Sequence, residues 1–387
     1  MRSRPDRLKY IAGIGVDRMG TIADASNADF LRLENLDVDI PPDADAVLRT
    51  QCAAGRDADN SYLPFVGQRR LRTIAAHHVS QASGVPYSAA RNCVISAGGL
   101  SGILNVLLAT IELGDEVIVT DPTYAGLINR IRLVGATPRF ASFRFTAGGR
   151  WTLDRDEMRR AVGKKTRAML LMSPSMPSGA CFDAEDWSLI AELCVANDLL
   201  LILDSAMERL VFDARPVIHP AALYGMASRT ITVGSSAKDL RMMGWRVGWV
   251  VGPEEFMPDI IAVSLANVVV PVGIAQDAVA TALENSYASI GGYVTELAAR
   301  RDTVVNQLEG LPYGMPDGGW SLLLRVSDFG IDGEVMSRRL LEHGVCATPM
   351  TGWGKTHGTQ YIRFVFANEP VQRLELLGAR VRKALSI

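Results

Sequence analysis

The feature that most constrains the fold is an alternation of short apolar runs with longer amphipathic segments, which begins near residue 90. The runs that read as strands are Cys93–Ser96, Glu116–Thr120, Ala168–Ser173, Leu199–Asp204, Thr230–Gly234 and Arg246–Gly252. Most of them are apolar on both faces, which is typical of a mostly parallel sheet covered by helices. Helical segments such as Ser101–Glu112 and Ala184–Asn197 lie between them. The alternation predicts a doubly wound α/β domain whose ligands bind beyond the carboxyl ends of the strands.

The last hundred residues have a different pattern. A long helical stretch, Ala275–Leu308, is followed by a break rich in Gly and Pro, an apolar run, a helix at Gly333–His343, a second apolar run and a final helix. This order predicts a smaller α+β domain. We expect an N-terminal segment (1–45) that contributes to the small domain, a large domain (46–275) and a small C-terminal domain (276–387).

Composition narrows the class of protein. The 387 residues are 48% hydrophobic and 21% charged, as in ordinary globular proteins, and the net charge of −2 gives no reason to bind nucleic acid or an acidic membrane. The five cysteines form no CxxC pair, which favours buried, reduced thiols. The N-terminus lacks the apolar core of a signal peptide, and the longest apolar stretch, Ile260–Ala275, is too short to span a membrane. We therefore expect a cytoplasmic protein with no membrane or nucleic-acid partner and no metal.

Lys238 is the first candidate for chemistry. It is the one lysine in the sequence that directly follows an apolar strand and small residues, where a desolvated amine could attack an aldehyde. Taken alone, it could equally be a surface lysine in a loop. Ser235, three residues before it, and Arg246, eight residues after it, could together bind a phosphate group, because Arg forms paired, charge-assisted bonds to phosphate.

The segment SSAKDLRMMGWRVG resembles the lysine motif of class I/II aminotransferases of pyridoxal-phosphate (PLP) fold type I, the aspartate aminotransferase superfamily. That motif has the form S-x-x-K followed, after several residues, by G-W-R-x-G. The resemblance extends over about residues 55–375. It implies the cofactor pyridoxal 5'-phosphate, held by Lys238 as a Schiff base, and a large domain with a smaller α+β domain beside it.

Two upstream motifs follow in the family's order. In ISAGGLSG, the backbone amides of Gly98, Gly99 and Leu100 can face a phosphate at a helix N-terminus, although the glycine pair alone could be a simple turn. In GDEVIVTDPTYAG, the resemblance implies that Tyr124 stacks on the pyridine ring, with a core tyrosine as the alternative.

Four further residues take their roles from the resemblance. Asp204 ends an apolar strand, where an unpaired carboxylate is costly, and it would pair with the pyridine nitrogen; a helix N-cap is the alternative. Arg363 would bind the substrate α-carboxylate. Tyr62 would reach the phosphate in a neighbouring subunit, which implies a homodimer. Trp353 lies near the expected mouth of the site, where it either touches substrate or anchors its loop.

The sequence departs from the family at two cofactor-binding positions. The family's second asparagine in N-P-x-N-P-T-G is Met176, and the tyrosine of D-x-x-Y is Met207. Both residues normally bond the phenolic oxygen of the cofactor. Without these donors the Schiff-base nitrogen should keep its proton to a higher pH, so its pKa should be raised. Ser175 or Ser205 could supply a replacement donor.

The sequence as a whole indicates a PLP-dependent transaminase that moves the amino group of an L-amino acid to a 2-oxo acid, with Lys238 and Asp204 as catalytic residues. A second hypothesis, motivated by the two methionines, is another PLP reaction, such as elimination, cyclisation or oxidation, in specialised biosynthesis. A remote third is a non-catalytic PLP-sensing domain, although the chain has no clear DNA-binding segment. The side chain of the substrate stays open.

Overall fold

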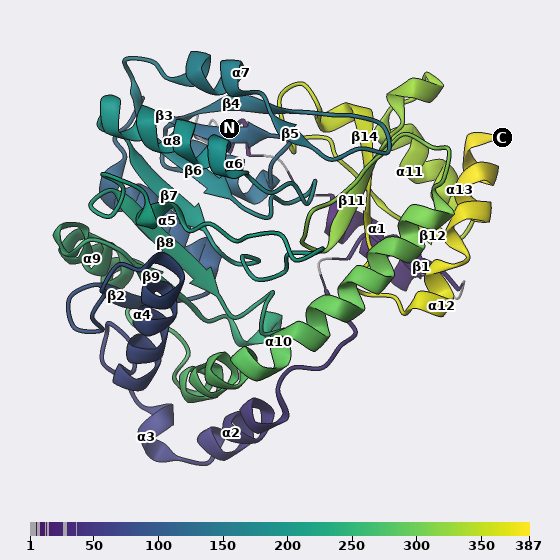
Figure 1. The fold of residues 1–387 in the computed structure, drawn as a ribbon. Helices are drawn as coiled ribbons and strands as arrows, with labels where there is room; N and C mark the ends of the chain where they lie inside the picture. Colours follow the sequence, from purple (N-terminus) through teal and green to yellow (C-terminus); the bar gives the residue numbers. More distant parts are fainter. Residues whose placement is uncertain (1–4, 6–7, 12, 14, 26–28, 36) are drawn as a thin grey trace.

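A computed structural model describes residues 5, 8–11, 13, 15–25, 29–35 and 37–387. Its main sheet has the strand order β2-β9-β8-β7-β6-β3-β4-β5 (Figure 1). The strands are β2 Cys93–Ser96, β3 Glu116–Asp121, β4 Thr137–Arg144, β5 Thr152–Leu153, β6 Thr166–Met172, β7 Leu200–Asp204, β8 Thr230–Ser235 and β9 Gly248–Val251. Neighbouring strands pair in parallel across β8, β7, β6, β3 and β4, and β9 runs antiparallel to β8 and β2. The predicted, mostly parallel sheet is confirmed.

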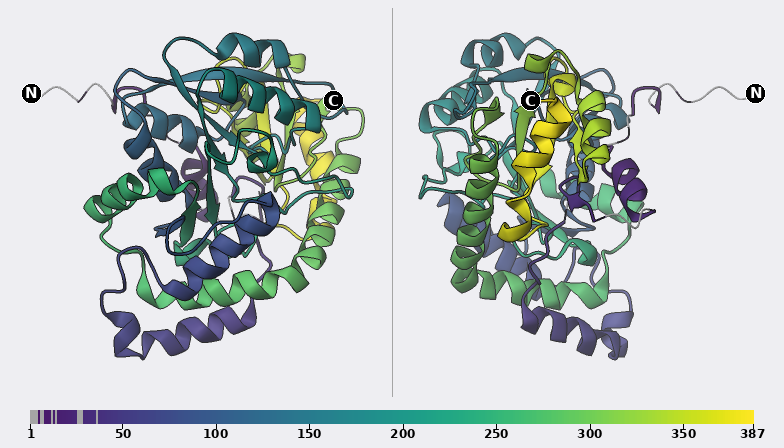
Figure 2. Two further views of the ribbon diagram at one scale, coloured as in Figure 1. Left: turned by 60° about the vertical axis from the view of Figure 1, so that its left-hand side comes forward. Right: turned by 90° about the vertical axis from the view of Figure 1, so that its right-hand side faces the viewer.

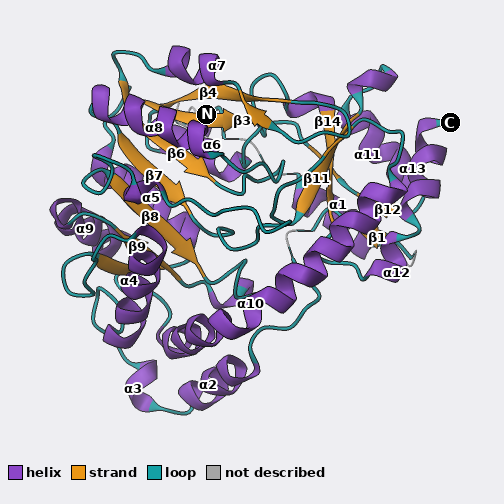
Figure 3. Ribbon diagram, in the orientation of Figure 1, coloured by secondary structure: helices purple, strands orange, loops and turns teal. Residues whose placement is uncertain are grey.

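Helices cover both faces of this sheet, as Figure 3 shows. Along β2, Val94 belongs to one apolar cluster and Ile95 to another, because successive side chains of a strand point to opposite faces. Helix α5 (Gly99–Thr110) and helix α9 (Met257–Asn267) contribute to the Val94 cluster, and α4 (Arg69–Ser83) contributes to the Ile95 cluster. The remaining helices of this part are α2 Ala44–Ala54, α3 Asp57–Asn60, α6 Ala125–Leu133, α7 Arg155–Ala161 and α8 Ala184–Ala196.

A second, smaller sheet lies beside the main one, in the order β10-β11-β14-β13. Its strands are antiparallel: β10 Tyr313–Gly314, β11 Ser321–Arg325, β13 Thr348–Pro349 and β14 Tyr361–Val365. The helices nearby are α1 Val16–Asp24, α11 Gly333–Glu342, α12 Val371–Leu374 and α13 Leu377–Leu385. Strand β1 (Leu31–Arg32) pairs in parallel with β12 (Val345–Cys346), which brings the N-terminal segment to the C-terminal part of the chain.

A single helix connects the two sheets. Helix α10 (Gly273–Gln307) extends along the molecule in both views of Figure 2. Its first half packs against α2 and α4, and its second half against α12 and α13. The expected division after residue 275 falls near the start of this helix and stays a prediction.

The structure differs from the expected elements at three places. The strand expected from Arg246 starts at Gly248, because Arg246 has a left-handed backbone (φ 56°) after a short 3-10 turn. Strand β4, which lies next to the short edge strand β5, was not predicted, since half-buried residues alternate along it with exposed or buried ones and it lacks a continuous apolar run. The apolar stretch Ile260–Ala275 is divided between α9 and α10. The expectation of buried thiols is wrong for Cys52, which is exposed on α2.

Within the part of the chain that the structure describes, no helix is both long enough and apolar enough to cross a membrane.

Candidate active site

A cavity of about 230 Å³ lies at the carboxyl ends of β6, β7 and β8. Parallel strands end together at this edge, so residues far apart in sequence meet there. The predicted residues that line the cavity are Gly99, Leu100, Tyr124, Met176, Asp204, Ser235, Lys238 and Arg246. Met172, Ala206, Ala237 and Met243 complete its wall.

Lys238 follows β8 and lines this cavity, where the residue is half-buried. Its Nζ lies 3.8 Å from the centre of the Trp320 ring. Burial, together with the positive charge of Arg363, lowers the pKa of Lys238 to about 7. A lysine with this pKa is largely neutral at slightly alkaline pH and can act as a nucleophile toward an aldehyde. The place of Lys238 in the cavity wall disfavours the alternative of a surface lysine.

Asp204, the last residue of β7, is 5% exposed and faces the same cavity. Its Oδ1 accepts a hydrogen bond from the amide of Ala206 at 3.1 Å. Burial raises its pKa to about 6, although Ala206, Arg130 and Lys238 act in the opposite direction. A cationic N–H donor in the cavity, such as a protonated pyridine ring, would supply the partner that this carboxylate needs to stay ionised.

The N-terminus of α5 and Arg246 form a binding site for an anion. Gly98 is the N-cap residue of α5 with φ 89°, and a Cβ atom there would lie 2.7 Å from Nη2 of Arg246. Gly248 has a related role, since a Cβ on it would lie 2.7 Å from the backbone of Gly98 and Gly99. These glycines allow β9, the α5 N-terminus and the guanidinium to come together. Unpaired helix N–H groups beside an arginine suit a phosphate group.

Tyr124 is half-buried at the start of α6 and lines the cavity. A Cβ on Gly126 would overlap the Tyr124 ring, so the glycine leaves room for the ring to lie there. The ring centre of Tyr124 is 5.2 Å from that of Trp353, in an edge-on arrangement. An aromatic face at this position can stack on a planar heterocycle.

Arg363 points from β14 into the interior with no exposed surface. Its Nη2 donates hydrogen bonds to the carbonyl oxygen of Glu34 at 2.8 Å and to Thr348 Oγ1 at 3.1 Å. Its Nε and Nη1 are buried and have no partner among the described residues. Burial lowers the pKa of Arg363 to about 10. The two unused donors leave this cation able to bind a carboxylate.

Trp353 is fully buried and makes no part of the cavity wall. The Arg363 guanidinium lies over its ring, 4.6 Å from the ring centre. The sequence left two roles open for Trp353, contact with the substrate and anchoring of its loop. This geometry favours the second, because the Trp353 ring packs against Arg363 and Tyr124 and does not line the cavity.

The other predicted positions lie outside the cavity wall. Met207 is buried, and a Cβ on Gly319 would lie 3.5 Å from its terminal methyl. Ser175 Oγ is buried without a hydrogen-bond partner among the described residues, and Ser205 donates to the carbonyl of Val233 on the other face of the sheet. Tyr62 is 81% exposed on the surface.

Three nearby residues were not singled out from the sequence. Trp320 contacts Lys238, Thr348 binds Arg363, and Arg130 donates to the carbonyl oxygen of Leu100 at 2.7 Å. Trp320 stands in a Gly-Gly-Trp break before β11, but nothing in that pattern indicates contact with a lysine some eighty residues earlier in the chain.

The cavity residues fit the expected cofactor. One cavity brings together four groups that the cofactor needs. They are a neutral amine for its aldehyde, a buried carboxylate for its ring nitrogen, an aromatic face for its ring and an anion site for its phosphate. The thioether of Met176 lies in the wall where the family has an amide.

Comparisons with known proteins agree with this geometry. The family described as aminotransferase class I and II matches residues 33–381. The arginine–pyruvate transaminase of Pseudomonas aeruginosa is 33% identical over 316 residues, which cover 80% of this chain and 79% of that protein. Human kynurenine–oxoglutarate transaminase 1 is 28% identical over an alignment of 394 positions that covers 93% of each chain. The structure of N-succinyldiaminopimelate aminotransferase from Mycobacterium tuberculosis superposes with a TM-score of 0.91 at 28% identity, covering 99% of this chain and all of the other.

Proposed function

Since the chain belongs to the class I and II aminotransferases, which are PLP-dependent transaminases, we propose that Lys238 holds the cofactor and performs the proton transfers of the reaction. The donor is an L-amino acid and the acceptor a 2-oxo acid. When bound, PLP withdraws electrons from the α-carbon of the amino acid and so makes its proton acidic.

Lys238 acts first as a nucleophile and then as a base. Its lowered pKa, about 7, leaves a neutral amine for the attack on the aldehyde. When it is not bonded to the cofactor, the same Nζ would take the proton from the α-carbon of the substrate and give it back later in the reaction. The contact with Trp320 limits where the side chain can move and excludes water on that side.

Asp204 and Arg363 orient the reacting groups. Asp204 keeps the ring nitrogen protonated through a charge-assisted bond, for which roughly 1.5–3 kcal/mol is typical. Arg363 binds the substrate carboxylate through its two unused donors, and Trp353 keeps the guanidinium in place. Leu100, Ser235 and Arg246, with the amides of Gly98 and Gly99, hold the phosphate.

The observation that carries the proposal is that the amine of Lys238 and the buried carboxylate of Asp204 face one cavity beside the α5 N-terminus. The test is a visible spectrum of the purified protein with a panel of donors that includes arginine, kynurenine, aspartate and an aromatic amino acid. We expect one donor to bleach the Schiff-base band stoichiometrically, without oxygen, and to yield its 2-oxo acid.

Variant Lys238→Ala should lose the band and the activity, whereas Lys165→Ala, in a loop remote from the cavity, should keep both. A Lys238→Ala protein that still forms the band would overturn the assignment.

A different PLP reaction stays the second candidate, because Met176 replaces a polar donor in the cavity wall. Elimination would release ammonia, oxidation would consume oxygen, and cyclisation would expel a leaving group from the substrate while keeping its nitrogen; none of the three forms a pyridoxamine product. Measuring ammonia and oxygen uptake beside the spectrum separates the two reactions.

The proposal includes a cytoplasmic homodimer in which Tyr62 completes the neighbouring site. The exposure of Tyr62 agrees with such a contact. Each mixed dimer of a Tyr62→Phe subunit and a Lys238→Ala subunit has one site with both Lys238 and Tyr62 and one site with neither. Mixing the two variants should therefore restore wild-type cofactor affinity at one of the two sites of each mixed dimer. If each subunit acts alone, mixing restores nothing.

A further inference from the structure

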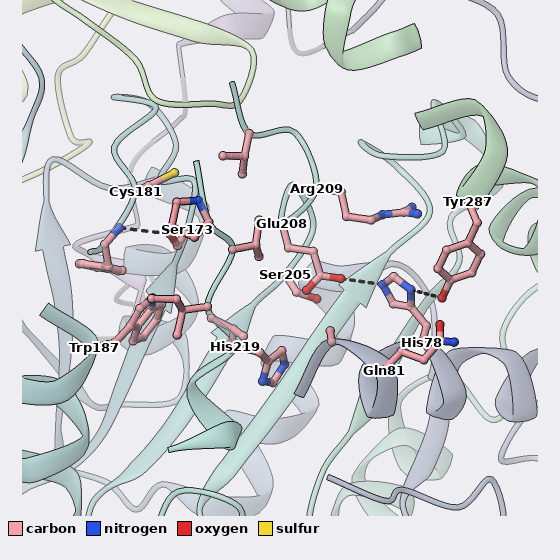
Figure 4. A pocket seen from close by; sticks show the side chains of 17 residues that line it. His78, Gln81, Ser173, Cys181, Trp187, Ser205, Glu208, Arg209, His219 and Tyr287 are labelled. Atoms are coloured by element: carbon pink, nitrogen blue, oxygen red, sulfur yellow. Dashed lines mark hydrogen bonds and ion pairs between the residues drawn. The ribbon is translucent and has the colours of Figure 1, made fainter. Parts of the chain in front are cut away.

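A second cavity, of about 310 Å³, lies on the opposite face of the sheet from the candidate active site (Figure 4). Along β7 and the residue after it, Asp204 lines the first cavity, whereas Leu203 and Ser205 line the second. The same alternation separates Met172 from Ser173 after β6. Alternate residues of a strand face opposite sides, so the two cavities are separate.

Most of the second cavity is apolar. Its apolar wall consists of Phe182, Trp187, Leu203, Val211, Val217 and Ile218. The rings of Phe182 and Trp187 pack edge to face with their centres 4.9 Å apart, which gives the wall a fixed shape. A cavity of this size and lining suits a small ligand with an aromatic or branched body.

Glu208 is the charged group of this cavity that can bind a ligand. It is 8% exposed, and its Oε1 lies 2.6 Å from Nε2 of His78, whose Nδ1 lies 2.8 Å from the Tyr287 hydroxyl. Burial acts to raise the pKa of Glu208, but the hydrogen bond and charge of His78 outweigh it, so the pKa is lowered. Glu208 Oε2 makes no hydrogen bond to any residue that the structure describes. Figure 4 shows this carboxylate near the middle of the lining side chains.

Two other ionisable groups of the cavity, Arg209 and His219, bond to protein partners. Arg209 donates from Nε to Asp239 at 2.9 Å and from Nη1 to Ser286 at 2.8 Å. His219 lies between the amide of Ala221 and the Thr232 hydroxyl, and burial lowers its pKa, which keeps it neutral. The unused acceptor is therefore the oxygen of Glu208.

We propose that the second cavity is a binding site for a small amphipathic amine. The protonated nitrogen donates a charge-assisted hydrogen bond to Oε2 of Glu208. The apolar body packs against Phe182 and Trp187. A carboxylate ligand is disfavoured, because it would place a second negative charge beside Glu208.

The probe is N,N-dimethyl-2-phenylethylamine. A tertiary amine can donate one hydrogen bond but cannot form a Schiff base, so its binding cannot be confused with reaction at the cofactor. In calorimetric titration of the holoenzyme we expect one saturable site per chain, with a Kd in the millimolar range or tighter, as fits a ligand of this size.

Two tryptophan variants locate the site. Val217→Trp, at a residue that is 58% exposed in the cavity wall, should abolish binding and leave transaminase activity unchanged. Leu48→Trp, at an equally exposed position on α2, should change neither. Glu208→Gln should weaken binding at least tenfold.

The proposal is overturned if Val217→Trp binds the amine as tightly as the wild type, or if the holoenzyme does not bind it. It is also overturned if 3-phenylpropionate binds more tightly than the amine and Val217→Trp abolishes that binding, since the site would then select anions.

Discussion

Replacing Arg363 with methionine is expected to separate substrate binding from cofactor binding. The arginine has Nε and Nη1 buried without partners among the described residues, and these two donors would bond the substrate carboxylate. At roughly 1.5–3 kcal/mol for each charge-assisted bond, their loss amounts to about 3–6 kcal/mol. That energy corresponds to a decrease in kcat/KM of roughly 10²- to 10⁴-fold.

The visible spectrum supplies the control, because Arg363 does not line the cofactor cavity. The variant should therefore bind PLP and keep its Schiff-base band. Removing this positive charge should also raise the pKa of Lys238, since Arg363 is the second-largest cause of its lowering.

The assay is the steady-state rate with the best donor, measured beside thermal unfolding of the holoenzyme. A variant that keeps its band and its Tm but loses less than tenfold in kcat/KM would refute the reasoning, since the unused donors would then have no carboxylate to bind.

Three further predictions concern the cofactor cavity. Met176→Asn should lower the pKa of the Schiff-base nitrogen, by roughly 1–2 units for one restored hydrogen bond, in a pH titration of the visible band; an unchanged midpoint would contradict the role given to Met176. The pKa of Asp204 is higher in the folded protein, at about 6, than in the unfolded chain. The cofactor-free protein therefore loses stability as the pH rises from about 4 to 6, and it does not regain that stability at higher pH. At pH 8, Asp204→Asn should therefore raise the Tm of the cofactor-free protein while lowering activity, and a lower Tm would count against the buried, unpaired carboxylate. Gly98→Ala should weaken PLP binding about tenfold or more in equilibrium dialysis, because the new Cβ would collide with Arg246. The control is Gly114→Ala: Gly114 has the same φ of 89° but open space around it, so this variant should lose stability and keep its PLP affinity.

Several features of the fold and site were predictable from the sequence alone. The apolar runs and the glycine-bounded helix start are local patterns, and they predicted the strands, α5 and the large parallel sheet. The spacing of Ser235, Lys238 and Arg246 is also local, since all three lie on or just beyond the ends of β8 and β9. Family membership, the cofactor and the transaminase activity were correctly inferred from the order of these motifs, which the comparisons confirm.

Other features were decided by tertiary contacts. Strand β4 lacks a continuous apolar run because it lies near the sheet edge, and only its pairing with β3 identifies it. Trp320 reaches Lys238, and Trp353 reaches Tyr124, from segments that meet only when the smaller sheet packs beside the main one.

Local sequence determined which residues carry chemical groups, because motif spacing and strand periodicity act over a few residues. Which buried groups stay unsatisfied, such as two donors of Arg363, depends on every neighbour in space. The same holds for Ser205, which follows Asp204 in sequence but lies in a different cavity. Burial and partner geometry arise from packing between distant segments, so only the folded structure shows where a buried charge still needs a ligand.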